Sequence, residues 1–261
     1  MQAPSKAASI VVPTYREADN LPTLVKRVFA AAGEAAIEAE MIIVDDDSRD
    51  GTADVVATLA DRYPVRLITR VDERGLSSAV LRGFSEASFD RFVVLDADLQ
   101  HPPEIVPALL TRLDEKPCDF VSATRYAGSG GIVEDWPWHR RVTSLVAKWM
   151  ARPLTPLSDP LSGCFALPRH VWERVDHLNP IGYKIALELY VKGRCHDPGE
   201  VPIRFETRKA GESKLTGAVM WRYVRHLAAL YSYRFPWLSW AGVGVLFVLA
   251  AWAVAAWLTR C

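Results

Sequence analysis

Short apolar runs alternate with helix-like segments through the first half of the chain. The runs have the composition of strands that are buried on both faces of a sheet, and they lie at Ala8–Val12, Met41–Val44, Val65–Thr69 and Phe92–Leu95. Between them, apolar residues recur at helical spacing. The first such segment follows Asn20, which is expected to cap a helix with Pro22 in its first turn. This alternation predicts an α/β fold with a mostly parallel sheet and right-handed crossovers.

The second half of the chain has a less regular pattern. Strand-like segments lie at Phe120–Ala123 and Glu200–Thr207, and the segment that begins at Asp159 has the pattern of a turn into a further strand. Helices are expected from about Val142 to Ala151 and from Gly182 to Gly193.

Polar residues follow three of the predicted strands at their carboxyl ends. They are Tyr15 and Glu17 after the first strand, the triplet 45–47 after the second, and residues 96–100 after the fourth. Because ligands of open α/β sheets bind at the carboxyl ends of the strands, we expect these residues to line one crevice. Consecutive aspartates repel one another, so the triplet needs hydrogen bonds or a cation to offset the repulsion, and Asp46 is the member expected to bind a nucleoside.

Asp96 and Asp98 are the strongest candidates for chemistry. Only Ala97 separates them, so a turn of the chain would let both carboxylates converge on one hard cation that faces a diphosphate. The alternative is an acidic strand-to-helix turn in which Asp98 acts as a cap. Gln100, His101 and the two prolines that follow favour the functional interpretation.

Composition narrows the class of protein. The 261 residues include 31 Lys and Arg and 31 Asp and Glu, so no global basic field points to nucleic acid. The four cysteines are far apart and form no Cys-x-x-Cys pair, which disfavours a zinc site and fits free thiols in a reducing compartment. Hydrophobic residues make up 50% of the chain, which is enough for a sizeable core.

The C-terminal region has the pattern of a membrane anchor. Residues 237–258 contain no charge, and this stretch is long enough to span a bilayer. The preceding segment, 217–236, mixes Trp and Tyr with Arg, as interfacial helices do, although a soluble amphipathic helix packed on the domain would look similar. Lys and Arg are denser before the span than after it, so the positive-inside rule predicts a single-pass protein with its catalytic domain on the cytoplasmic side.

The motif Asp-Ala-Asp-Leu-Gln-His-Pro-Pro-Glu at 96–104 resembles the metal-binding motif of family 2 glycosyltransferases, which have the GT-A (Rossmann-like) fold. Within that family it is most similar to the polyprenyl-phosphate sugar transferases. The resemblance covers about residues 9–216, so residues 1–216 would form the catalytic domain. It implies that Asp96, Asp98 and Gln100 hold Mg²⁺ or Mn²⁺ against the diphosphate of a nucleotide sugar.

The same resemblance implies two substrate sites. Pro-Thr-Tyr-x-Glu and Val-Asp-Asp-x-Ser resemble nucleotide-binding signatures, and Arg-x-x-Gly-x-Ser-Lys resembles a flap over the diphosphate. Carried over, the nucleotide sugar would contact Pro13, Tyr15, Glu17, Val44, Asp46, Asp96, Ala97, Asp98, Arg208 and Lys214. An Arg after the acidic motif and an Arg-x-x-x-Ser on the next helix imply an acceptor phosphate at Arg125, Arg140 and Ser144, with Arg141 an adjacent competitor. The role of Asp159 stays open.

Together these features predict a membrane-anchored, metal-dependent inverting glycosyltransferase. It would move mannose from GDP-mannose to a polyprenyl phosphate such as dolichyl phosphate, with Asp98, Arg125, Arg140 and Arg208 as its catalytic residues. UDP-glucose or another nucleotide sugar is the nearest alternative donor. A catalytically silent, membrane-anchored nucleotide-binding module would need no acceptor site. A processive polysaccharide synthase would carry several membrane spans and a Gln-x-x-Arg-Trp motif, which this sequence does not contain.

Overall fold

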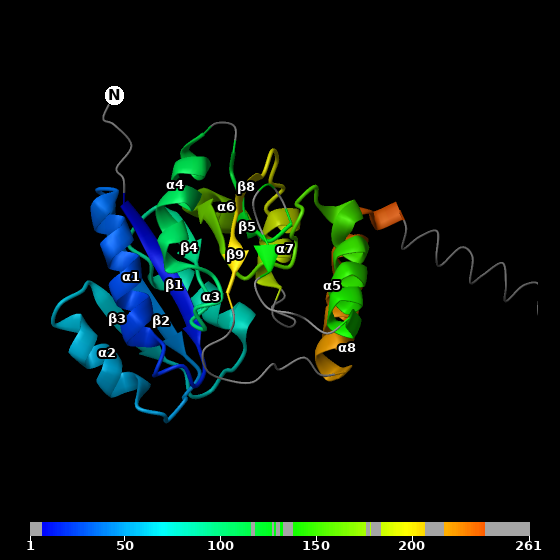
Figure 1. The fold of residues 1–261 in the computed structure, drawn as a ribbon. Helices are drawn as coiled ribbons and strands as arrows, with labels where there is room; N and C mark the ends of the chain where they lie inside the picture. Colours follow the sequence, from blue (N-terminus) through cyan, green and yellow to red (C-terminus); the bar gives the residue numbers. More distant parts are fainter. Residues whose placement is uncertain are drawn as a thin grey trace, which may run out of the picture.

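The computed structural model describes residues 7–115, 118–126, 128, 131–132, 138–175, 178, 184–206 and 217–237, with the side chains of all but 132, 138–143 and 217–220. Within these residues a seven-stranded sheet has the order β3-β2-β1-β4-β7-β5-β8 (Figure 1). Its strands are β1 (Ala7–Thr14), β2 (Glu38–Asp45), β3 (Val65–Thr69), β4 (Arg91–Val94), β5 (Val121–Thr124), β7 (Phe165–Pro168) and β8 (Gly199–Pro202). A second sheet pairs β6 (Gly131–Ile132) with β9 (Arg204–Phe205).

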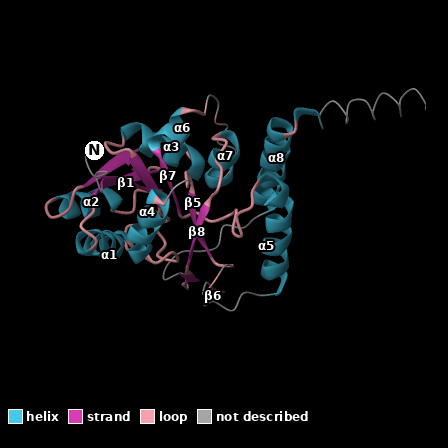
Figure 2. Ribbon diagram, turned by 90° about the horizontal axis from the view of Figure 1, so that it is seen from above, coloured by secondary structure: helices cyan, strands magenta, loops and turns pink. Residues whose placement is uncertain are grey.

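Helices cover both faces of the larger sheet (Figures 1 and 2). They are α1 (Leu21–Glu34), α2 (Thr52–Ala60), α3 (Leu76–Glu86), α4 (Val106–Asp114), α5 (Trp138–Ala151), α6 (Arg169–Glu173), α7 (Ile185–Lys192) and α8 (Gly217–Arg234), with 3-10 turns η1 (Pro103–Ile105) and η2 (Arg152–Leu154). Side chains alternate along β1, so Ile10 and Val12 join the core under α1 and α4. Val11 points the other way, into the core under α3 and α7. A sheet covered on both faces explains the continuous apolar runs.

The predicted mostly parallel sheet is confirmed, with one exception. β1 pairs in parallel with β2 and β4, β2 with β3, and β5 with β8. β7 is antiparallel and lies between β4 and β5. The predicted strand 200–207 is two strands: β8 joins the larger sheet and β9 the smaller one.

The local predictions at the first strand and the first helix were wrong in part. The first strand was predicted over Ala8–Val12, with Pro13 after its end, but β1 continues through Pro13 to Thr14. The backbone polar groups of Val11 and the nitrogen of Pro13 point toward β4, where Val11 O accepts a hydrogen bond from Leu95 N. The pairing of β1 with β4 ends at Val11, so the N–H that Pro13 lacks removes no hydrogen bond from the sheet. Asn20 occupies the N-cap position of α1, but its side chain makes no capping hydrogen bond; its Nδ2 donates to Glu17 Oε2 at 2.7 Å.

Helices α5 and α8 lie side by side at one end of the molecule (Figures 1 and 2). Tyr223 and Tyr231 of α8 donate hydrogen bonds from their hydroxyls to the carbonyls of Ala147 and Met150, each at 2.7 Å. α5 begins at Trp138, four residues before the predicted start. None of the helices in the described ranges is both long enough and apolar enough to cross a membrane, and residues 238–258 of the predicted span lie outside those ranges.

Candidate active site

The carboxyl ends of β2, β1 and β4 lie next to one another and form what we call the carboxyl edge. Asp46 N donates to Thr14 O at 3.2 Å, which joins the end of β2 to the end of β1. Leu95 N donates to Val11 O at 3.1 Å, which joins β4 to β1 on the other side. The strand order therefore brings the three polar segments from the sequence to one edge, because parallel neighbours share the direction of their carboxyl ends.

The acidic motif after β4 forms a tight, buried turn. Leu99 adopts a left-handed conformation with φ of 61°, which is strained for a branched apolar residue and recurs at functional sites. The turn lets Asp98 Oδ1 accept a hydrogen bond from Gln100 N at 3.1 Å. Gln100 is also tied to the residue that follows β9, because its Nε2 donates to Glu206 O at 3.3 Å and its carbonyl accepts from Glu206 N at 2.9 Å. Asp98 thus does act as a local turn acceptor, and it shares this turn with Asp96 and Gln100.

His101 is the neighbour of Asp96 at the base of this turn. Its Nδ1 lies 3.5 Å from Asp96 Oδ2, and Nε2 lies 3.5 Å from Ser162 Oγ. Burial lowers the pKa of His101 to about 4, so the imidazole is neutral at pH 7. The buried Nδ1 makes no hydrogen bond. Sequence analysis placed His101 in the motif without assigning it a role, and in the structure its neutral ring lies directly beside the Asp96 carboxylate.

The acidic turn suits a hard divalent cation that is shared with a substrate. Among the described residues, no three His, Cys, Asp or Glu side chains are grouped so that they could hold a metal by themselves. Mg²⁺ in phosphoryl-substrate sites is typically held by one or two carboxylates and completes its coordination with phosphate oxygens and water. Two carboxylates that are separated by one residue, on a turn fixed by hydrogen bonds, match the protein's part of such a sphere.

The acidic triplet after β2 is neutralised by specific partners. Asp45 accepts hydrogen bonds from Ser48 N at 2.9 Å and from Thr14 Oγ1 at 3.2 Å. Asp46 forms a buried ion pair with Arg70, whose Nε donates at 2.9 Å, and accepts a 2.7 Å hydrogen bond from Gly75 N. Asp46 therefore holds the segment 70–75 at the carboxyl edge. The sequence analysis missed Arg70, because nothing local links it to an aspartate 24 residues earlier.

Tyr15 has two guanidinium groups close to its ring. Arg16 lies 5.3 Å and Arg74 lies 5.7 Å from the centre of its ring, distances typical of cation–π contacts. Arg74 comes from the segment that Asp46 holds. Sequence analysis identified neither of these two arginines as a neighbour of the Tyr15 ring.

Arg125, at the end of β5, is held by Asp159. Its Nε and one terminal nitrogen donate to the two carboxylate oxygens at 2.7 and 2.9 Å, and both side chains are almost fully buried. Burial by itself would lower the pKa of Arg125, but the hydrogen bonds from Arg125 to Asp159 and the negative charge of Asp159, with smaller contributions from Tyr126 and Asp96, together raise this pKa above its ordinary value. Burial likewise opposes ionisation of Asp159, and Arg125 still holds the pKa of that carboxyl below its ordinary value. An ionised, fork-bound carboxylate is a poor general base.

Of the other residues predicted to contact phosphate groups, only Ser144 has a side chain in the described part of the structure. Ser144 Oγ lies 3.0 Å from the hydroxyl of Tyr126, the residue after Arg125, so α5 meets the end of β5 here. Arg140 lies on α5 one turn before Ser144, and its side chain is outside the described part. Arg208 and Lys214 also lie outside the described residues.

Lys184, just before α7, is a further cation near this site that the sequence analysis did not single out. Its Nζ donates to Leu161 O at 2.6 Å. Burial, followed by the nearby charge of Arg125, lowers the pKa of Lys184 to about 8, while Asp96 and Asp159 act in the opposite direction. Lys184 is therefore close enough to the acidic turn and to the Arg125–Asp159 pair to interact with both.

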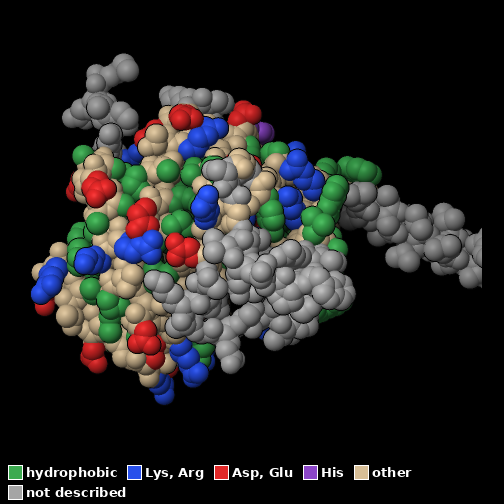
Figure 3. Space-filling model, viewed as in Figure 1, with side chains coloured by type: hydrophobic (Ala, Val, Ile, Leu, Met, Phe, Trp, Pro, Cys, Tyr) green, Lys and Arg blue, Asp and Glu red, His purple; other side chains and the backbone are tan. Residues whose placement is uncertain are grey.

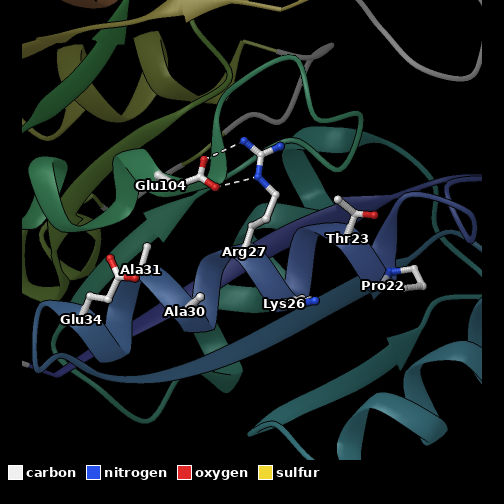
Figure 4. Close-up of a pocket in the computed structure, with 8 residues that line it drawn as sticks. All are labelled: Pro22, Thr23, Lys26, Arg27, Ala30, Ala31, Glu34 and Glu104. Carbon is white, nitrogen blue, oxygen red and sulfur yellow. Dashed lines mark hydrogen bonds and ion pairs between the residues drawn. The ribbon is translucent and has the colours of Figure 1, made fainter.

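A separate surface groove of about 540 Å³ lies along the outside of α1 (Figure 4). Arg27 and Glu104 form a two-pronged ion pair across it, at 2.6 and 2.7 Å. None of its lining residues belongs to the predicted site. Figure 3, which has the same view as Figure 1, shows acidic and basic side chains interspersed over the described surface. This agrees with the equal numbers of acidic and basic residues in the chain.

Comparison with known proteins identifies the family. The model of glycosyl transferase family 2 matches residues 9–173, which include the carboxyl edge and the Arg125–Asp159 pair. The chain belongs to glycosyltransferase family 2. Among curated family 2 relatives, the dolichol-phosphate mannosyltransferase of Mycosarcoma maydis is 47% identical over 96% of this chain and 86% of its own length. The dolichol-phosphate mannosyltransferase of Saccharomyces cerevisiae is 48% identical over 87% of this chain and 88% of its own length.

A solved glycosyltransferase shares the fold. The crystal structure of glucosyl-3-phosphoglycerate synthase from Mycobacterium tuberculosis, in complex with Mn²⁺, UDP and glucosyl-3-phosphoglycerate, matches with a TM-score of 0.61. The match covers 87% of this chain and 79% of that chain at 20% identity, so it establishes a GT-A-like fold and no more. The predicted family and the mixed, mostly parallel sheet with flanking helices are therefore both confirmed.

Proposed function

We propose that this family 2 enzyme transfers mannose from GDP-mannose to a polyprenyl phosphate such as dolichyl phosphate, with inversion at the anomeric carbon. The observation that carries the proposal is the near-complete coverage, at 47–48% identity, of two relatives named for mannose transfer to dolichol phosphate. Arg125 supports it, because a cation fixed beside the acidic turn is suited to an anionic acceptor. A silent nucleotide-binding module would have no use for this group.

The donor would bind at the carboxyl edge. Asp96, Asp98 and Gln100 would hold Mg²⁺ or Mn²⁺, as suggested by the fit of the acidic turn and by the Mn²⁺ and UDP bound to the structural relative. The ion would neutralise charge that develops on the leaving diphosphate. The nucleoside end would contact Pro13, Tyr15, Glu17, Val44 and Asp46, with Ala97 beneath the sugar diphosphate and Arg208 and Lys214 closing over it.

The acceptor would bind where β5 meets α5, against Arg125, Arg140 and Ser144. A phosphate monoester has a second pKa of about 6, so near pH 7 it is mostly a dianion and needs no base to become a nucleophile. The site then has to orient the attacking oxygen and stabilise the leaving group. This agrees with Asp159, whose carboxylate is engaged by Arg125.

The membrane would supply this lipid acceptor, and α5 and α8 would rest on it. Large apolar side chains on the two helices face outward, and three tryptophans, Trp149, Trp221 and Trp237, are 62–69% exposed. Trp beside Arg and Lys is typical of the lipid interface. Residues 217–236 would then lie in the interface, residues 237–258 would span the bilayer, and residues 1–216 would face the cytoplasm.

A donor panel tests this function. Purified full-length protein is given radiolabelled GDP-mannose, UDP-glucose or other nucleotide sugars with a short polyprenyl phosphate and Mg²⁺ or Mn²⁺. We expect lipid-linked label from GDP-mannose only, and its loss with chelator. Transfer only from UDP-glucose would make the donor assignment wrong. Tight nucleotide binding without transfer from any donor would favour the silent module.

A further inference from the structure

The segment 159–163, Asp-Pro-Leu-Ser-Gly, connects the two halves of the site. It lies before β7, the antiparallel strand inserted between β4 and β5. β4 leads to the acidic turn and β5 leads to Arg125, so a segment at this position can reach both. It does so through three different kinds of contact.

The first contact is steric and involves Gly163 and Asp96. A Cβ added to Gly163 would lie 2.8 Å from Asp96 Cγ and 2.9 Å from Oδ1, and closer still to Oδ2. Separations under 3.0 Å force something to move. The carboxylate of Asp96 therefore rests directly on the bare Cα of Gly163, with His101 behind it at 3.5 Å. Any side chain at 163 would push this carboxylate out of its position.

The second and third contacts hold the rest of the segment. Asp159, at its start, forms the buried pair with Arg125. Leu161, in its middle, accepts the 2.6 Å hydrogen bond from Lys184 Nζ at the entry to α7. The segment is thus fixed to β5 at one end, to α7 in the middle and to the acidic turn at the other end.

We propose that residues 159–163 are a positioning segment that fixes the metal side and the acceptor side of the site against each other. Gly163 sets the position of the Asp96 carboxylate, and Asp159 sets the position of the Arg125 guanidinium. Lys184 anchors the segment between these two contacts. This rests on the proposed function, in which Asp96 binds the metal and Arg125 the acceptor. Groups that support a metal ligand from behind typically change metal affinity by about 10- to 100-fold when altered.

The test is Mn²⁺ binding by the full-length protein with GDP, followed by the electron paramagnetic resonance signal of free Mn²⁺. Gly163→Ala should raise the Mn²⁺ dissociation constant by about tenfold or more. Gly33→Ala is the matched control, because a Cβ there meets nothing within 4 Å, and it should bind Mn²⁺ like the wild type. Gly83→Ala is the steric control: its Cβ would crowd Val11 in the core, so it should lower thermal stability and leave Mn²⁺ affinity unchanged.

Lys184→Met tests the shared anchor. It should raise both the Mn²⁺ dissociation constant and the KM for polyprenyl phosphate by at least about threefold, while the KM for GDP-mannose at saturating Mn²⁺ changes less. Wild-type Mn²⁺ affinity in Gly163→Ala overturns the proposal, as does a Lys184→Met variant in which neither quantity changes. A wild type that binds no Mn²⁺ would instead overturn the metal role in the proposed function, and this inference with it.

If Gly163→Ala does not fold, a second variant still tests whether the new methyl group clashes with Asp96. Asp96→Ala removes the carboxylate that the new methyl group would strike, so the double variant with Gly163→Ala should be as stable as Asp96→Ala alone. A double variant that also fails to fold would show that the clash is not with Asp96, and the proposal would be wrong.

Discussion

Replacing Asp159 with Asn tests whether this carboxylate is an anchor or a base. The substitution keeps the shape of the side chain and removes the charge that faces Arg125. Side-chain exposures of 2% for Asp159 and 11% for Arg125 leave little water to compensate. Breaking a buried ion pair by removing one partner costs about 3–5 kcal/mol. Asn still offers one acceptor oxygen, so we expect about 3 kcal/mol, or roughly 6–12 °C in melting temperature.

Glu104→Gln is the matched control, because Arg27 and Glu104 form a similar two-pronged pair at 28% and 50% exposure. Exposed pairs contribute up to about 1 kcal/mol. The two variants, compared by thermal unfolding in the same buffer, should therefore differ by about 2 kcal/mol or more. Equal losses of stability in the two variants would show that the buried Arg125–Asp159 pair stabilises the fold no more than the exposed Arg27–Glu104 pair does.

The stability difference should depend on pH in a defined direction. The pKa of Asp159 is lower in the folded protein than its ordinary value, so the folded state binds this proton less readily than the unfolded state. The contribution of Asp159 is fully present above the unfolded pKa of about 3.9 and is lost as the pH falls through the folded pKa. The wild-type advantage over Asp159→Asn should therefore persist at pH 5–7 and shrink below pH 4.

The kinetic result distinguishes the two roles. If Asp159 positions Arg125, Asp159→Asn should raise the KM for polyprenyl phosphate, while the single-turnover rate at saturating acceptor stays within about tenfold of wild type at every pH, because general-base catalysis contributes about 10²–10⁴. Normal binding of both substrates, combined with a loss of several orders of magnitude in single-turnover rate, would refute this reasoning. A dedicated base would then exist.

Three further predictions concern the metal, the acceptor and the anchor. Asp98→Asn should fold, as measured by circular dichroism, and lose most activity, because an amide is a poor ligand for a divalent cation; full turnover in excess chelator would contradict the metal role. Arg125→Ala and Arg140→Ala should each raise the acceptor KM by roughly 10- to 150-fold, equivalent to about 1.5–3 kcal/mol, and a rise in the donor KM alone would contradict the assignment. Removing residues 237–261 should release the protein from membranes in a flotation assay and leave GDP binding intact; loss of nucleotide binding would mean that this segment belongs to the core.

The sequence by itself determined the first four strands, the parallel direction that they share and the polar residues that follow three of them. Apolar runs such as Met41–Val44 are predictable because a sheet covered on both faces excludes polar residues, and this exclusion is visible within a few neighbouring positions. Polar residues that follow such runs, as Asp96 and Asp98 do, must emerge at the carboxyl edge. The family followed from this motif, and the comparisons confirmed it.

Only the tertiary structure decided which of these residues hold one another. Asp46 meets Arg70, Arg125 meets Asp159, and Gly163 meets Asp96, across separations of 24 to 67 residues in the chain. No local period encodes such pairs, because they depend on the order of strands in the sheet and on the insertion of antiparallel β7 between β4 and β5. An ion pair or a steric contact acts over a few ångströms in space, whereas hydrophobic periodicity acts along the chain. The sequence could therefore predict which candidate residues follow the ends of strands, but not the contacts that orient their side chains.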